Sequence, residues 1–126
     1  TAIEQGHVTL AKLLINYGAD VNARTKGGIT PLHQAAEQGQ ETLAKLLIKC
    51  GANVNVASRD GYTPLHNAAL GSSGTTSPSH LAMVQLLTQK GANINARTTN
   101  LDQTPLALAY KDSDIEDYLT NHGGVR

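Results

Sequence analysis

The chain has 126 residues with only four tyrosines and no Phe or Trp, so its core must be built from Leu, Ala, Val and Ile. Ten basic and ten acidic residues cancel, which argues against charge-driven binding to nucleic acid or to a membrane surface. The single Cys50 excludes an internal disulfide and indicates a reducing, cytoplasmic location, and no apolar run approaches the roughly 20 residues that span a bilayer.

The first 24 residues predict a helix that is followed by an extended segment. Its apolar residues have the i, i+3, i+4, i+7 spacing of one helix face: Leu10, Leu13, Leu14 and Tyr17. The pattern then returns, because Leu47, Gly51 and Asn55 each lie 33 residues after an identical residue. A fixed period of this size indicates a stack of similar units that bury their apolar faces against one another.

The second unit, residues 25–57, begins with a strong helix-start signal. Thr30 can cap the helix, Pro31 suits its first position, and His33 can reach back to the cap backbone. A short inner helix is therefore predicted to end near Gln38, with Gly39 as its stop. Its inward residues are expected to be Leu32, Ala35 and Ala36.

An outer helix is predicted over roughly residues 41–50. Leu43, Leu46, Leu47 and Cys50 mark its buried face, and Gly51 ends it. An extended segment then leads to a tight turn at Asp60-Gly61. Each unit thus reads as helix, turn, helix and a hairpin-like finger.

The third unit, residues 58–97, carries an interruption between its two helices. Leu47 and Leu87 are 40 residues apart, seven more than the period, and we place the insertion at residues 71–79. Its Gly, Ser, Thr and Pro residues favour a loop. The loop is either a contact element or a tolerated insertion, since lengthening a surface loop costs little.

The fourth unit, residues 98–126, is shorter and more polar than the others. Ala107 stands where the earlier units have His, so we expect a weaker cap. The finger before it has one extra residue and lacks the turn glycine, so we expect it to bend differently. The acidic residues of 112–117 suit a helix N-terminus. This unit is expected to close the stack, and the chain is expected to be a fragment of a longer array.

The segments TPLHQAA, LAKLLIKCGANVN and DGYTPLHNAA together resemble the ankyrin repeat. This resemblance implies an all-α ankyrin-repeat solenoid of about four units, with the first unit partial and the last a capping repeat. It further implies antiparallel helix pairs with projecting fingers, and a concave palm made of fingers and inner helices.

The chain lacks the motifs of hydrolases, metalloproteases, nucleotide-binding loops and redox cysteines. We therefore expect no enzyme activity, no cofactor and no metal. His33 and His66 are expected to act at helix starts, and the remaining histidines, His7, His80 and His122, to lie at the surface.

Asn22, Asn55 and Asn95 share one position after the outer helix. A turn side chain that bonds local backbone is the simpler interpretation. The ankyrin resemblance implies that they are also candidates for hydroxylation by an oxygen-dependent enzyme.

The resemblance places partner binding on the finger tips and the exposed side of the inner helices. The expected finger contacts are Arg24, Lys26, Ile29, Arg59, Asp60, Tyr62, Arg97, Leu101 and Gln103, and the expected helix contacts are Glu37, Gln38, Leu70 and Tyr110. Four of them are basic, and Tyr and Arg are enriched in binding hot spots. We expect a monomer that binds a protein or peptide with an acidic segment and an apolar anchor. The alternatives are that these are ordinary solvated charges, or that the chain is the targeting or regulatory arm of a larger enzyme, channel or secreted effector.

Overall fold

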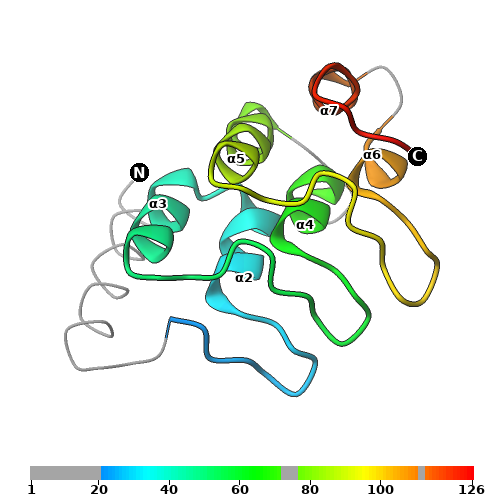
Figure 1. The fold of residues 1–126 in the computed structure, drawn as a ribbon. Helices are drawn as coiled ribbons and strands as arrows, with labels where there is room; N and C mark the ends of the chain where they lie inside the picture. Colours follow the sequence, from blue (N-terminus) through cyan, green and yellow to red (C-terminus); the bar gives the residue numbers. More distant parts are fainter. Residues whose placement is uncertain (1–20, 72–76, 111–112) are drawn as a thin grey trace.

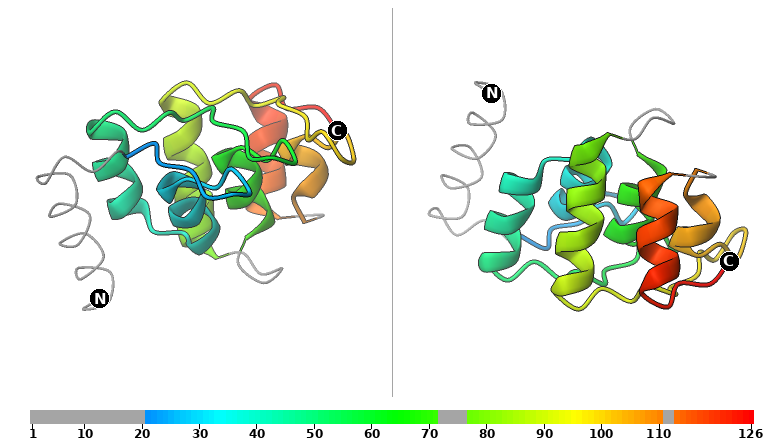
Figure 2. Two further views of the ribbon diagram at one scale, coloured as in Figure 1. Left: turned by 90° about the horizontal axis from the view of Figure 1, so that it is seen from below. Right: turned by 90° about the horizontal axis from the view of Figure 1, so that it is seen from above.

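The computed structural model describes residues 21–71, 77–110 and 113–126, which contain six helices and no β-strand. The helices are α2 (Pro31–Gln38), α3 (Glu41–Lys49), α4 (Pro64–Leu70), α5 (Pro78–Gln89), α6 (Pro105–Leu108) and α7 (Asp114–Asn121). They form two layers, with α2, α4 and α6 in an inner row and α3, α5 and α7 in an outer row (Figures 1 and 2). This arrangement confirms the all-α stack of helix-turn-helix units. The helix predicted near residues 8–17 lies outside the described residues.

The predicted cap is present at the start of two inner helices. The hydroxyl oxygens of Thr30 and Thr63 accept from the N–H groups of His33 and His66, at 3.4 Å in both cases. In return, the Nδ1 atom of each histidine accepts from the threonine N–H at 3.0 Å. This reciprocal pair is a capping box in which histidine takes the place of Glu or Gln. Two otherwise unpaired backbone donors are satisfied at each helix start.

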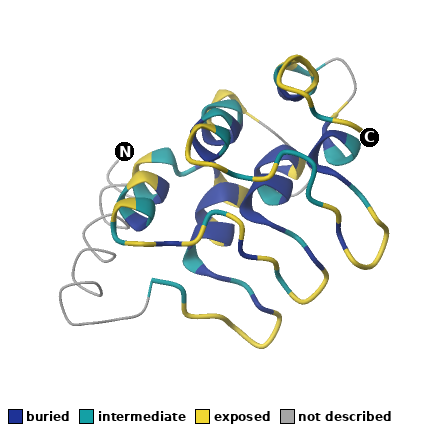
Figure 3. Cartoon of the chain, in the orientation of Figure 1, coloured by how far each residue is buried: buried dark blue, intermediate teal, exposed yellow. Residues whose placement is uncertain are grey.

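The core lies between the two layers (Figure 3). The inner helices contribute side chains with no exposed surface: Leu32, Ala35, Ala36, Leu65, Ala68 and Ala69. The alanines keep the inner helices thin enough for neighbouring elements to pack closely. The outer helices add fully buried residues of their own: Ala44, Met83, Val84, Leu87 and Leu119.

The buried face of α3 differs from the predicted one. Leu47 is buried as expected, but Leu43, Leu46 and Cys50 are only half-buried, and Ala44 is buried in their place. Ala44 and Leu47 are three residues apart, so they mark the line along which α3 meets the core. Cys50 lies at the C-cap position, just beyond the last turn of the helix.

The insertion predicted at residues 71–79 is in part helical, since α5 already begins at Pro78. Ser77 and His80 occupy the capping-box positions of α5, and Ser77 N–H donates to His80 Nδ1 at 3.0 Å, as threonine N–H groups do in the inner helices. His80 is only 5% exposed, and its Nε2 lies 2.6 Å from the Glu37 carbonyl oxygen of α2. The expectation that His80 lies at the surface is therefore wrong. It is a buried cap that ties α5 to the preceding unit.

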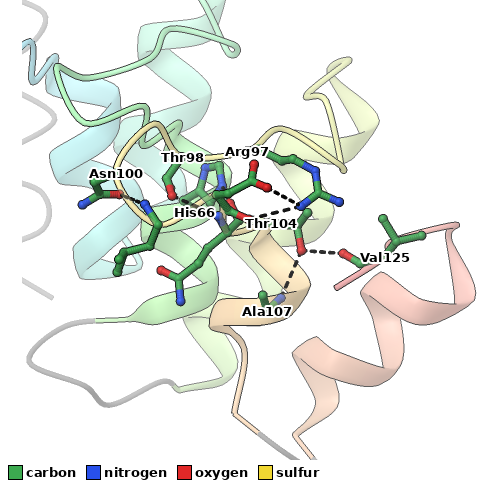
Figure 4. Close-up of polar contacts among 10 residues, drawn as sticks. His66, Arg97, Thr98, Asn100, Thr104, Ala107 and Val125 are labelled. Atoms are coloured by element: carbon green, nitrogen blue, oxygen red, sulfur yellow. Dashed lines mark hydrogen bonds and ion pairs between the residues drawn. The ribbon is translucent and has the colours of Figure 1, made fainter.

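The last unit is capped by threonine alone. Ala107 N–H donates to the Thr104 hydroxyl oxygen at 3.2 Å, so this bond is not longer than its counterparts at Thr30 and Thr63. The Thr104 hydroxyl donates in turn to the carbonyl of Val125, near the end of the chain (Figure 4). Replacing His by Ala removes the imidazole half of the capping box and leaves the hydroxyl half in place. The following helix, α7, has its acidic residues in the first turn, as predicted.

Candidate functional site

Three loops, called fingers here, lead into the inner helices: residues 23–29, 56–62 and 96–103. They project side by side from one edge of the two helix layers (Figure 1). Each is closed by a bond from a Ser or Thr N–H to the carbonyl just before the next helix cap: Thr25 to Ile29 (3.0 Å), Ser58 to Tyr62 (2.8 Å) and Thr98 to Gln103 (2.9 Å). The fingers are thus tight turns, and none of their residues is in a β-strand.

The third finger accommodates its extra residue through an unusual backbone conformation at Asp102. Gly28 and Gly61 take positive φ angles of 77° and 83° in the first two fingers, and Asp102 takes φ 53° in the same place. Asp tolerates this region better than most residues with a side chain. The turn glycine is therefore replaced, and the finger still closes (Figure 4).

Backbone hydrogen bonds join neighbouring fingers into one row. Arg59 N–H donates to the Gly27 carbonyl at 2.8 Å, and Thr99 N–H donates to the Asp60 carbonyl at 2.8 Å. At both junctions the second residue of one turn bonds to the third residue of the turn before it. The tips are thus held in a fixed spacing, and a bound partner would meet a pre-formed surface.

The cap histidines also fix the fingers to the helices. His33 Nε2 lies 2.7 Å from the Tyr62 carbonyl, and His66 Nε2 lies 2.8 Å from the Gln103 carbonyl (Figure 4). Because Nδ1 already accepts from a backbone N–H, Nε2 must carry the ring proton and donate. Each histidine therefore attaches the finger of the next unit to its own helix, in addition to the predicted capping role.

Burial lowers the pKa of His33 and of His66 below 6.5, and the hydrogen bonds to the Tyr62 and Gln103 carbonyls oppose this only in part. The neutral ring is thus the form that the fold favours. It is also the form that can accept at Nδ1 and donate at Nε2 at the same time.

The three asparagines bond to the next unit rather than to local backbone. Asn55 Nδ2 donates to Gly91 O at 3.0 Å, and its Oδ1 accepts from Asn93 N–H at 2.6 Å. Asn22 and Asn95 make the same pair of bonds one unit earlier and one unit later. Their side chains therefore connect successive units. Hydroxylation of these residues stays a prediction, and the mass of the intact chain would test it.

A groove of about 320 Å³ lies between the first two fingers and the inner helices. Five of the predicted contact residues line it: Ile29, Glu37, Asp60, Tyr62 and Leu70. Four further lining residues were not predicted: Gly27, Ser58, Asn67 and Gly71. We call the groove, the three fingers and the exposed residues of the inner helices the palm.

The other predicted contact residues do not line this groove. On the fingers they are Arg24, Lys26, Arg59, Arg97, Leu101 and Gln103, and beside the inner helices they are Gln38 and Tyr110. Most of them are exposed, and Leu101 has the largest exposed fraction among the large apolar residues that the structure describes, 67%. Gln103 is half-buried, because it lies at the base of the third finger.

Two of the four basic finger residues have partners within the chain. Arg24 donates to the Ala57 carbonyl at 2.6 Å, and Arg97 pairs with Asp102 at 3.5 Å. Lys26 and Arg59 are exposed and form no ion pair with any residue that the structure describes. The positive charge available to a partner is therefore concentrated on the tips of the first two fingers.

The side chain of Tyr62 packs against a neighbouring ring. Its ring meets that of His66 edge-on, with centroids 5.7 Å apart and planes at 60°, and the residue is half-buried. A partly held aromatic ring at the side of a groove loses little conformational entropy on binding. Tyr62 is thus a well-placed anchor for a partner.

Within the described residues, no group of three or more His, Cys, Asp or Glu side chains is placed to hold a metal ion. No helix in this part of the chain is long and apolar enough to cross a membrane.

The chain matches a protein-family model over most of its length. A model described as ankyrin repeats (three copies) matches residues 1–98, which correspond to the first three predicted units. No protein with a curated description matches the chain. The fourth unit, beyond the match, continues the two layers with α6 and α7.

Proposed function

Since the chain belongs to the ankyrin repeat family, whose members are generally protein–protein interaction modules, we propose that it binds a protein or peptide partner on its palm without catalysing a reaction. The observation that carries this proposal is the groove. Five of the thirteen predicted contact residues line it, although they come from two fingers and two helices.

The chemistry of the palm supports a partner that is anchored by contacts of two kinds. Tyr62, Ile29 and Leu70 offer apolar surface in the groove, and Lys26 and Arg59 offer positive charge on the tips above it. We therefore propose that acidic residues of the partner contact these two basic side chains. The chain is proposed to act as a monomer.

Alanine substitution at Tyr62 tests this proposal. Proteins captured from a lysate of the source cells would be identified first, and their affinities for purified variants would then be measured by calorimetry. We expect Tyr62→Ala and Arg59→Ala each to weaken binding by about 1–3 kcal/mol, because such residues dominate interface energies. Lys49→Ala, which removes one exposed positive charge from α3 in the outer layer, is the matched control.

The circular dichroism of all three variants should match that of the wild type, because the bonds that hold the second finger use the backbone of Tyr62 and Arg59. A partner that binds both finger variants as tightly as the wild type would remove the palm as its site.

A further inference from the structure

The wall of the groove is acidic, although the fingers around it are basic. Glu37 and Asp60 line it from α2 and from the second finger, and no Lys, Arg or His is among the lining residues. Both acidic residues are exposed, and neither forms an ion pair with a described residue. Two formal negative charges are thus available inside the groove.

The helix ends and an amide oxygen beside the groove also carry negative partial charge. Glu37 belongs to the last turn of α2, and Leu70 and Gly71 are the last residue and the C-cap of α4, so both helices direct the negative ends of their dipoles towards the groove. Asn67 Oδ1 is buried and has no hydrogen-bond partner among the described residues. Its partial negative charge is therefore not compensated by a donor.

The positive groups near the groove do not line it. The Arg24 guanidinium is bound to the Ala57 carbonyl, and His33 is buried and favours its neutral form. Lys26 and Arg59 lie on the finger tips and do not line the groove. Among the lining residues, the charged groups are thus the carboxylates of Glu37 and Asp60 alone, and a cation that enters the groove would contact them.

The remaining lining residues suit the uncharged part of a long side chain. Ile29, Leu70 and the ring of Tyr62 offer apolar contact for methylene groups, and an aromatic face attracts a cation. A volume of about 320 Å³ is at the lower end of the range of ligand pockets, roughly 300–1,000 Å³. It therefore suits one or two side chains rather than a large ligand.

We propose that the groove receives an arginine or lysine side chain of the bound partner, with the cation between Glu37 and Asp60 and its stem against Tyr62. This inference rests on the proposed function of the palm and specifies its partner. A matching segment would carry a basic residue for the groove and acidic residues for the tips, and this mixed pattern separates it from a purely acidic ligand.

Selection of random peptides displayed on phage tests this inference. Peptides recovered on the wild-type chain are screened against Tyr62→Ala, and those that are lost are palm binders. Their dissociation constants are then measured by fluorescence anisotropy with synthetic peptides. The test variant is Glu37→Gln combined with Asp60→Ser, because serine suits a turn and has no charge. The control is Asp114→Asn combined with Asp117→Asn, which removes two exposed negative charges from α7.

We expect the palm binders to share an Arg or Lys, and the Glu37/Asp60 variant to bind them about tenfold more weakly than the control. Replacing that basic residue of the peptide by Met should give a similar loss on the wild type and little further loss on the variant, because the two changes remove the same contact.

Palm binders without a basic residue, or an affinity within about twofold of the wild type on the Glu37/Asp60 variant, would overturn the inference and leave the proposed function standing. If no recovered peptide depends on Tyr62, the proposed function fails together with it.

Discussion

Replacing Asn55 by Ala is expected to weaken the contact between the second and third units. The change removes two hydrogen bonds, from Nδ2 to Gly91 O at 3.0 Å and from Asn93 N–H to Oδ1 at 2.6 Å. A typical intramolecular hydrogen bond contributes about 0.5–1.5 kcal/mol net. Both freed backbone groups belong to exposed residues and can bind water, so the cost should stay in the lower half of the summed range. We expect the free energy of unfolding to fall by about 1–2 kcal/mol.

Asn53→Ala is the matched control, because within the described residues Asn53 Oδ1 accepts from Asn55 N–H alone, two residues along the chain, at 2.9 Å. The local bond should account for about 0.5–1 kcal/mol. Urea unfolding followed by circular dichroism would give both values at constant m-value. An Asn55→Ala cost no larger than that of Asn53→Ala would show that these asparagines act within their own loop, and the proposed connection between units would be wrong.

Two further perturbations test the finger attachments. Burial lowers the pKa of His33 and of His66 in the folded chain. Below pH 6.5 the unfolded chain therefore binds protons that the folded chain excludes. We expect the full free energy of unfolding above pH 6.5, and a decrease as the pH drops towards the folded pKa values. Urea unfolding between pH 7.5 and 5 would measure this slope, and a His33→Gln/His66→Gln variant with an unchanged slope would assign it to other groups. Gly61→Ala would place a Cβ 2.5 Å from Thr99 N at a residue with φ +83°. We expect the free energy of unfolding to fall by about 1–3 kcal/mol and the third finger to be displaced. Gly51→Ala is the control, because its Cβ meets no atom within 4 Å and the change should cost less. Equal losses for the two alanine variants would show that the close approach of the fingers is not a constraint.

The helix pairs could be predicted because their signals are local and repeated. The Thr-Pro start, the histidine three residues after the cap, and Gly39 as a left-handed stop all act within a single helix. The same reasoning could have found His80, since Ser77-Pro78-Ser79-His80 has the spacing of Thr30-Pro31-Leu32-His33. Its position inside a Gly- and Ser-rich insertion concealed it. Composition favoured a loop where the cap chemistry forms a helix.

The connections between units could not be predicted from periodicity alone. The repeated asparagine was visible in the sequence, but its partner depends on how far one unit is displaced from the next. The same holds for His33, whose Nε2 bonds to Tyr62 O, 29 residues away. The groove is lined by both Gly27 and Gly71, which are 44 positions apart in sequence. Such placements follow from the packing of whole units, which no local pattern encodes.

The bonds that hold the stack together also determine where recognition can vary. The histidines and asparagines that connect units must keep their chemistry, because each satisfies backbone groups of a neighbour. Within the described residues, the side chains of the groove residues Glu37, Asp60 and Leu70 make no bond of this kind to a neighbouring unit, and the residue types at such positions differ between units. In the second unit Glu37 lines the groove, and the equivalent position of the third unit is Leu70, seven residues after the cap threonine in both. Moving the groove one unit along would therefore replace a carboxylate by an apolar side chain. An acidic groove can thus form at this junction without any change to the framework that stacks the units.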